Sequence, residues 1–178
     1  MESSMQPNLV LAGFMGTGKT AVGTLLAKHL DRSFVDTDEV IENKAGTSIS
    51  HIFAEQGEPR FRELERSVLA ELKQPDGLVV AIGGGAVLDP ENVRHLTEGG
   101  VVVCLQADAE TLLARLAAKT DRPLLEGGGR KAEILRLMSE RQQAYAALPF
   151  HVVTDGLTLK EVADRVLEIY AEGCKSWV

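Results

Sequence analysis

The segment that most constrains the fold is Gly13–Thr20, which has the pattern Gly-x4-Gly-Lys-Thr. A short apolar run, Leu9–Ala12, comes directly before it, and Ala21–Leu30 follows with apolar residues at helical spacing. Strand, loop and helix therefore appear in the order that a P-loop requires. In such a loop successive backbone N–H groups point into one concavity that suits phosphate oxygens, and the N-terminus of the following helix also favours an anion.

Two side chains at the end of this loop carry the chemistry expected of it. Lys19 can reach the β- and γ-phosphates of a nucleotide, and the Thr20 hydroxyl can bind Mg²⁺. The other interpretation is an ordinary glycine turn. The strand and helix patterns on either side of the loop favour the phosphate site.

Length and composition favour one globular domain that spans residues 1–178. The 178 residues are 44% apolar and 25% charged, which is typical of one domain with a full core. The net charge of −7, without a basic run, argues against nucleic acid or an anionic membrane as the main partner. The N-terminal residues lack a secretory leader pattern, so we expect a cytoplasmic protein. We also expect Cys104 and Cys174 to be unpaired.

Apolar runs that alternate with helical patterns predict an α/β fold. Leu78–Ile82 and Val101–Leu105 are almost continuously apolar, as in a parallel sheet that is buried on both faces. The other expected strands are Leu9–Ala12, Ser33–Asp36 and His151–Thr154. Proline or N-cap signals indicate helix starts at Pro59, Asp89, Asp108 and Thr158, and a further helix is expected from about Lys131.

The segment Thr120–Arg130 is expected to be a mobile surface loop. It holds a proline and three consecutive glycines between two helical patterns. Arg122 lies in this loop, where a cation on a closing lid can reach a transferring phosphate and stabilise the transition state. The other interpretation of Arg122 is an ordinary surface arginine.

Two carboxylates follow the second expected strand, at the edge where open α/β sheets bind ligands. If the strand conformation continues through Asp36-Thr37-Asp38, both carboxylates lie on one face. Phosphoryl transfer needs charge neutralisation at the γ-phosphate and placement of the attacking hydroxyl. One carboxylate can serve Mg²⁺ through water and the other a substrate hydroxyl. The alternative is a solvated turn that caps the next helix.

Three further features have two interpretations each. Gly83–Gly85 lets a backbone approach a ligand closely, or else forms a flexible connection. Arg62 lies off the apolar stripe of its helix with Glu65 at i+3, which is also the pattern of a salt-bridged solvent face. Arg141, with Tyr145 four residues later, has the same two interpretations. Two converging arginines clamp a carboxylate, but spacing alone does not show convergence.

Taken together, these segments resemble the shikimate kinase family over nearly the whole chain. The matching motifs occur in the family's order and at about its spacing: the P-loop, Asp36–Asp38, Phe61–Glu65, Gly83–Val87, Arg122–Leu125 and Arg141–Tyr145. The resemblance implies a nucleoside-monophosphate-kinase-like fold, with a five-stranded parallel sheet, helices on both faces, a lid at about residues 120–130 and a substrate-binding region. It also implies ATP-dependent phosphorylation of the 3-hydroxyl of shikimate, on the route to aromatic amino acids.

The resemblance also implies roles on the ATP side of the site. Thr20 would bind Mg²⁺, and Asp36 would hold the same ion through water. Arg122, on the lid, would reach the transferring phosphate. The ATP phosphates would be held by Lys19 and by the loop residues Met15, Gly16, Thr17 and Gly18.

On the acceptor side, the resemblance implies that Asp38 binds the attacking hydroxyl and is the candidate base. Arg62 and Arg141 would grip the shikimate carboxylate, and Gly84 would contact the substrate through its backbone. The pocket needs no second chain, so a monomer is expected.

The chain departs from the family pattern at Thr154–Thr158, where some members carry an arginine-rich turn beside adenine. Adenine would then be held mostly by backbone and stacking, with Arg115 as a candidate neighbour. The rival functions are another small-molecule kinase of this fold, for gluconate or a nucleoside monophosphate, and a non-catalytic nucleotide-binding module. Two carboxylates and two candidate arginines favour a hydroxylated ring acid.

Overall fold

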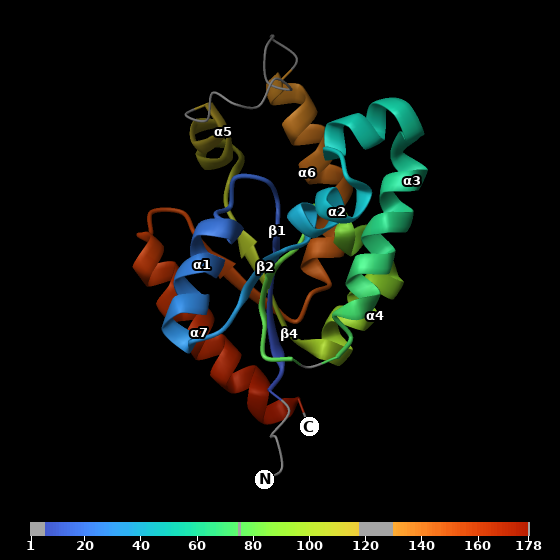
Figure 1. Cartoon of the computed structure of the whole chain (residues 1–178). Helices are drawn as coiled ribbons and strands as arrows, with labels where there is room; N and C mark the ends of the chain where they lie inside the picture. Colours follow the sequence, from blue (N-terminus) through green and yellow to red (C-terminus); the bar gives the residue numbers. More distant parts are fainter. Residues whose placement is uncertain (1–5, 75, 118–129, 178) are drawn as a thin grey trace.

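The computed structural model describes residues 6–74, 76–117 and 130–177, which are built around a parallel sheet (Figure 1). In this part of the chain five strands are hydrogen-bonded in the order β2-β3-β1-β4-β5. Each expected strand is confirmed, with its ends shifted by one residue at most. The strands are β1 (Asn8–Gly13), β2 (Phe34–Asp36), β3 (Val79–Ala81), β4 (Gly100–Gln106) and β5 (Phe150–Val153).

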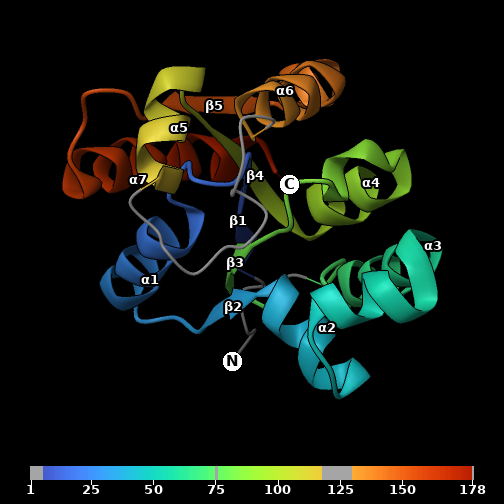
Figure 2. The ribbon, with the colours of Figure 1, turned by 90° about the horizontal axis from the view of Figure 1, so that it is seen from above.

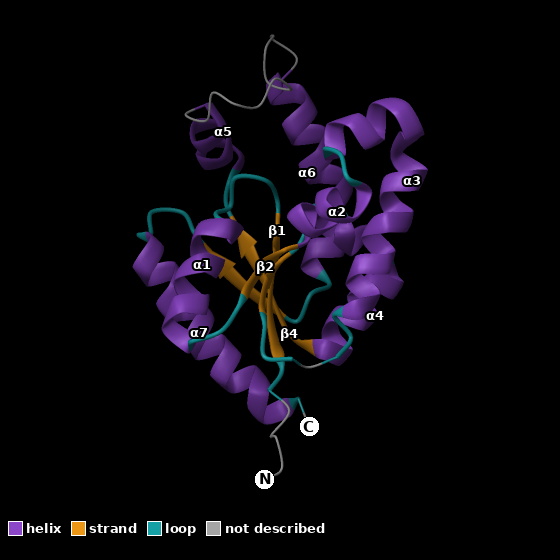
Figure 3. Ribbon diagram, viewed as in Figure 1, coloured by secondary structure: helices purple, strands orange, loops and turns teal. Residues whose placement is uncertain are grey.

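Helices cover both faces of this sheet, which confirms the three-layer α/β class (Figures 2 and 3). Helices α1 and α7 pack on one face, and α4, α6 and the C-terminal part of α3 pack on the other. The described helices are α1 (Lys19–Leu30), α2 (Thr37–Ala45), α3 (Ile49–Glu71), α4 (Pro90–Gly99), α5 (Ala109–Ala117), α6 (Arg130–Ala146) and α7 (Leu159–Ser176), with the short 3₁₀ helix η1 (Ala86–Leu88) after β3.

The apolar strands are buried on both sides, as their composition predicts. Leu11 and Val103 belong to the core under α1 and α7, whereas their neighbours Val10 and Val102 belong to the core under α3, α4 and α6. Successive strand residues point to opposite faces, so a continuous apolar run fills both cores.

Most helices begin where their signals predicted. The Asp89 side chain accepts a hydrogen bond from the Glu91 N–H (2.9 Å) and caps α4, and Thr158 opens α7 with a complete capping box. Gly57 interrupts α3 with φ 79° and ψ 168°, so its second helical run begins near Pro59. The helix expected from about Lys131 begins at Arg130.

The condition under which Asp36 and Asp38 would share a strand face, a strand that continues through Asp38, is not met. Strand β2 ends at Asp36, and α2 begins at Thr37. The reason is local, because the Asp36 side chain accepts a hydrogen bond from the Asp38 N–H (3.0 Å) and caps the helix. Asp38 therefore lies in the first turn of a helix and shares no strand face with Asp36.

Three other expectations concern the rest of the chain. The loop expected at Thr120–Arg130 lies outside the described residues, apart from Arg130. Cys104 and Cys174 are both free, as expected. None of the helices in the described ranges combines the length and apolar character that crossing a bilayer requires.

Candidate active site

The P-loop connects the end of β1 to the start of α1 (Figure 1). Gly18, the N-cap of α1, has φ 97°, a left-handed conformation that glycine adopts without steric cost. A Cβ on Gly13 would lie 2.4 Å from the Leu105 carbonyl oxygen, so only glycine fits there. The Lys19 ammonium donates to the carbonyl oxygens of Gly13 (2.7 Å) and Phe14 (3.1 Å) and therefore lies against the loop.

Thr20 and Asp36 lie side by side next to this loop. The Thr20 hydroxyl donates to Oδ2 of Asp36 (3.3 Å), and both residues line the same cavity. A hydroxyl and a carboxylate are oxygen donors of the kind that Mg²⁺ prefers, and in kinases water and substrate phosphates supply its other ligands. In the described ranges no three His, Cys, Asp or Glu side chains are grouped to hold a metal ion. The pair therefore fits a Mg²⁺ that arrives with the nucleotide.

One cavity of about 590 Å³ joins the P-loop to three of the four candidate acceptor residues, and Arg62 is not part of its lining. Arg115, at one side of it, donates to the Gly16 carbonyl oxygen (3.3 Å) and the Thr154 hydroxyl (3.0 Å). This contact places the candidate adenine neighbour beside the loop. The candidate residues in the cavity wall are Met15, Gly16, Thr17, Gly18, Lys19, Thr20, Asp36, Asp38, Gly84 and Arg141.

The candidate acceptor residues converge on Gly83–Gly85, which follows β3. A Cβ on the first, second and third glycine would lie 2.9 Å from Oδ1 of Asp38, 3.0 Å from Nη1 of Arg141 and 2.6 Å from Nη2 of Arg62. The three side chains come from α2, α6 and α3. The absence of side chains on the glycines is what lets all three approach one short piece of backbone.

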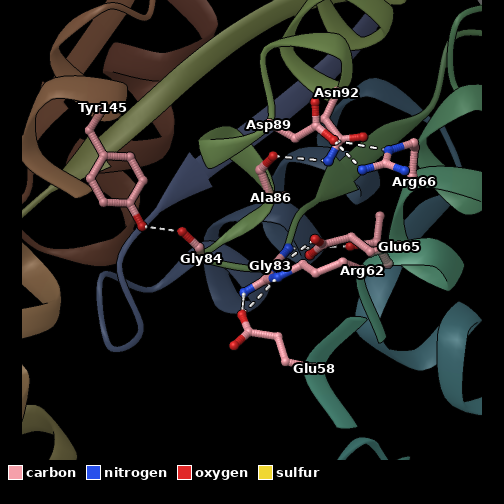
Figure 4. Close-up of polar contacts among 11 residues, drawn as sticks. Glu58, Arg62, Glu65, Arg66, Gly83, Gly84, Ala86, Asp89, Asn92 and Tyr145 are labelled. Carbon is pink, nitrogen blue, oxygen red and sulfur yellow. Dashed lines mark hydrogen bonds and ion pairs between the residues drawn. The ribbon is translucent and has the colours of Figure 1, made fainter. Parts of the chain in front are cut away.

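Arg62 is salt-bridged, as one interpretation of its sequence position held, and it also faces this site. Its guanidinium pairs with Glu58 (3.0 Å) and with Glu65 (2.7 Å) (Figure 4). It also lies over the Phe61 ring at 5.2 Å. Burial works to lower the pKa of Arg62, but the two ion pairs raise it above its ordinary value. Arg62 is therefore a permanent cation in a fixed orientation beside Gly85.

Glu65 is a feature of the site to which the sequence assigned no role. Its side chain is only 2% exposed. Burial raises the pKa of its carboxyl and Asp38 adds to the rise, whereas the ion pair with Arg62 and the charge of Arg141 lower it. The missed signal was its spacing, because Glu65 lies four residues after the buried Phe61, on the apolar side of the helix.

Arg141 connects the acceptor side to the P-loop. Its guanidinium lies over the ring of Phe14 at 5.5 Å, and Phe14 is a residue of the P-loop. One turn later on α6, the Tyr145 hydroxyl donates to the carbonyl oxygen of Gly84 (2.6 Å). Arg122 lies outside the described residues.

A P-loop that faces a pocket with a carboxylate and two arginines defines a class of protein, the P-loop kinases that phosphorylate a small acidic molecule. The shikimate kinase family model matches residues 15–171. A shikimate kinase of Desulforudis audaxviator is 48% identical over 165 residues, covering 93% of this chain and 87% of that protein. A solved shikimate kinase from Acinetobacter baumannii, in complex with shikimate, superposes with a TM-score of 0.86 and 36% identity over 94% of each chain.

The chain belongs to the shikimate kinase family and is an ATP-using enzyme that phosphorylates shikimate. The resemblance inferred from its motifs is therefore confirmed. A gluconokinase from Sinorhizobium meliloti has a TM-score of 0.63 at 15% identity, which is a likeness of fold alone. The gluconate alternative is therefore supported by a shared fold alone.

Proposed function

We propose that the γ-phosphate of ATP passes to the 3-hydroxyl of shikimate in the cavity between the P-loop and Gly83–Gly85, giving shikimate 3-phosphate and ADP. The observation that carries this assignment is the convergence of Asp38, Arg62 and Arg141 on the three glycines. A ring acid needs cations for its carboxylate and an acceptor for its hydroxyl proton, and these side chains provide both.

On the nucleotide side, Lys19 and the backbone N–H groups of Met15–Gly18 hold the phosphates. Thr20 would bind Mg²⁺ and Asp36 would hold it through water, and the contact between the two side chains at 3.3 Å supports this pairing. When bound, Mg²⁺ neutralises the charge that builds up on the transferring phosphate. The polar groups of Arg115 and the backbone near Thr154 border the place for adenine.

On the acceptor side, Arg62 and Arg141 bind the carboxylate of shikimate, and the Gly84 backbone lies against its ring. Asp38 accepts a hydrogen bond from the attacking hydroxyl and takes its proton as the phosphate transfers. A loose transition state asks mainly for positioning and charge stabilisation. The position of Asp38 in the first turn of α2 fixes its carboxylate beside Gly83.

Several further assignments complete the proposal. Arg122 reaches the transferring phosphate from a lid at about residues 120–130, a segment that falls mostly outside the described residues. Residues 1–178 work as one domain, as a monomer in the cytoplasm, with no nucleic acid or membrane as partner. The net charge of −7 supports the last point, because polyanions repel such a protein.

The test is ADP release from MgATP by the purified protein, with shikimate, gluconate, AMP, CMP or no acceptor in parallel. We expect strong stimulation by shikimate alone, and its loss in Asp38→Ala. Stimulation by another acceptor would keep the ATP site but overturn the roles of Arg62 and Arg141. No stimulation by any acceptor would favour a non-catalytic module.

A further inference from the structure

Tyr145 is a buried residue of the site that the roles above leave unused. It lies on α6 one turn after Arg141, and 8% of its surface is exposed. Its hydroxyl donates a hydrogen bond of 2.6 Å to the Gly84 carbonyl oxygen (Figure 4). Tyr145 therefore connects the helix that carries Arg141 directly to the glycine backbone.

The segment Gly83–Leu88 receives other supports from other elements. The Thr37 hydroxyl, at the start of α2, accepts a hydrogen bond from the Gly83 N–H (3.3 Å). The Asn92 amide, on α4, donates to the Ala86 carbonyl oxygen (3.0 Å). Each of these contacts holds a different peptide group. The Tyr145 hydroxyl holds the Gly84 carbonyl, which belongs to the peptide between Gly84 and Gly85.

That peptide needs an external support because of its composition. Glycine has more backbone freedom than any other residue, so three glycines in a row do not set one orientation by themselves. A trans peptide is planar, and its C=O and N–H groups point in opposite directions. A bond that holds the Gly84 carbonyl toward α6 therefore holds the Gly85 N–H away from α6.

We propose that Tyr145 is a positioning residue for the acceptor, which fixes the Gly84–Gly85 peptide at one distance from Arg141. The distance between the Arg141 guanidinium, which binds the carboxylate, and the Gly84 backbone, which contacts the ring, then has a single value. This inference rests on the proposed roles of Arg141 and Gly84. It gives the family match at Arg141–Tyr145 a physical reason, because residues at i and i+4 lie on one helix face.

The hydroxyl stays a donor over the working range of pH. Burial raises the pKa of Tyr145 to about 12, although Arg141 works to lower it. Tyr145 also borders a second cavity of about 520 Å³, together with Phe14, Cys104 and Met138. A phenylalanine ring fits the same space, so Tyr145→Phe removes the hydrogen bond and leaves the packing of α6 in place.

The chain offers a matched control in Tyr170, its other tyrosine. Its hydroxyl also donates to a backbone carbonyl oxygen at 2.6 Å, that of Pro7, and the residue is 6% exposed. Tyr170 also accepts a hydrogen bond from the Arg32 guanidinium (2.7 Å). It lies on α7, packed against the opposite face of the sheet. Tyr170→Phe therefore removes a bond of the same kind, together with the bond from Arg32, far from the acceptor.

The experiment compares Tyr145→Phe with Tyr170→Phe in steady-state kinetics and thermal unfolding. We expect Tyr145→Phe to raise KM for shikimate about three- to ten-fold, as the loss of one buried hydrogen bond allows. The KM for ATP should change less than about two-fold, and the effect should be equal at pH 6 and pH 9. Tyr170→Phe should lower Tm at least as much without changing either KM, because it also loses the bond from Arg32.

An unchanged KM for shikimate in Tyr145→Phe would overturn the inference. So would a fall in kcat together with equal rises in both KM values, because that pattern indicates a general structural role. The double variant Tyr145→Phe with Arg141→Lys adds a second test. Positioning predicts that Tyr145→Phe has little further effect once Arg141 is replaced, and additive effects would contradict it.

The single variant Arg141→Lys separates this inference from the proposed function. A raised KM for shikimate in Arg141→Lys, with Tyr145→Phe unchanged, keeps the proposed function and rejects the role of Tyr145. The reverse result rejects the role of Arg141 and, with it, the proposed coupling between the two residues.

Discussion

The nucleotide half of the site comes mainly from one continuous segment, Gly13–Thr20. The acceptor half combines α2 and α6 side chains that line the cavity with Arg62 of α3, which lies beside Gly85. The first half depends on backbone conformation, with φ of 97° at Gly18. The second depends on contacts between elements, such as Arg62 with Glu65 and Tyr145 with Gly84. A binding loop can therefore be encoded locally, while a substrate pocket on the same sheet requires the whole fold.

The largest effect is expected where the halves meet, at Asp38. Asp38→Asn should lower kcat about 10²–10⁴-fold, the usual contribution of a general base, with KM for shikimate changed only a few-fold. The measurement is steady-state kinetics with both substrates varied. Glu39→Gln, an exposed neighbour on the same helix, is the control and should be near wild type. A rise in KM alone would reject Asp38 as the base.

The next largest effect should be on shikimate binding, with ATP binding almost unchanged. Arg141→Lys keeps the positive charge but loses the planar fork that binds a carboxylate, so KM for shikimate should rise about ten-fold. The KM for ATP should stay within about two-fold. Arg136→Lys, an exposed residue of the same helix that pairs with Glu133 and Glu140, should change neither value. Equal rises in both KM values would show that the halves are not separable.

A smaller effect is expected from the buried acid that supports Arg62. Glu65→Gln removes an ion pair but keeps the side-chain shape, so KM for shikimate should rise about three-fold, as for one ordinary hydrogen bond. Arg60→Gln, which breaks an exposed pair with Glu63 on the same helix, is the control. An unchanged KM in Glu65→Gln would mean that Arg62 needs no support.

The same variant changes the pH dependence of stability in a defined direction. The pKa of Glu65 is raised by burial above its ordinary value of 4.5, so the folded state binds this proton more tightly than the unfolded state. Its contribution to the free energy of unfolding therefore falls as pH rises from 4.5 through the folded pKa. Denaturant unfolding at several pH values should show a flatter profile for Glu65→Gln, and an unchanged profile would contradict the shift.

The smallest effect should come from Asp89, which supports the acceptor half indirectly. Asp89→Ala removes the cap of α4 and the ion pair with Arg66 at 2.9 Å, at a cost of about 1 kcal/mol in the free energy of unfolding. The Glu91 N–H, then Arg66, lower the pKa of Asp89 below 3.8. Its stabilisation is therefore present above pH 3.8 and lost as pH falls through the folded pKa.

Thr158→Ala, which removes the cap of α7, provides the comparison for Asp89. Its loss of stability should be similar, at about 1 kcal/mol. Only Asp89→Ala should also raise KM for shikimate, by about two-fold, because only Asp89 is joined to the helix that carries Arg62. A similar change of KM in both variants would indicate general destabilisation.

The same contrast explains what the sequence alone could predict. The strands and the P-loop were predictable because apolar runs and glycine spacing act over short distances. The conformation of Asp38 had been left open between a continued strand and a helix cap, and the Asp36 side chain caps α2 directly after the strand. The capping interpretation of that segment, which the sequence had left open, was the correct one for the backbone.

The convergence of the two arginines on one site could not be predicted from their spacing in the sequence. Arg62 and Arg141 are far apart in the chain, and only the fold brings them, from α3 and α6, to the glycines that follow β3. Glu65 and Tyr145 were missed as supports for the same reason. An ion pair between Arg62 and a residue at i+3 is as common on a solvent face as in a site, and burial is what distinguishes them.

The central claim is that one cavity holds both substrates, with Asp38 between them. The most direct test is a crystal structure of the protein with shikimate and a non-hydrolysable ATP analogue. The account predicts the shikimate carboxylate between Arg62 and Arg141, and the 3-hydroxyl at Asp38 facing the terminal phosphate on the P-loop. Shikimate bound without contact to these arginines, or with its 3-hydroxyl away from Asp38, would contradict it.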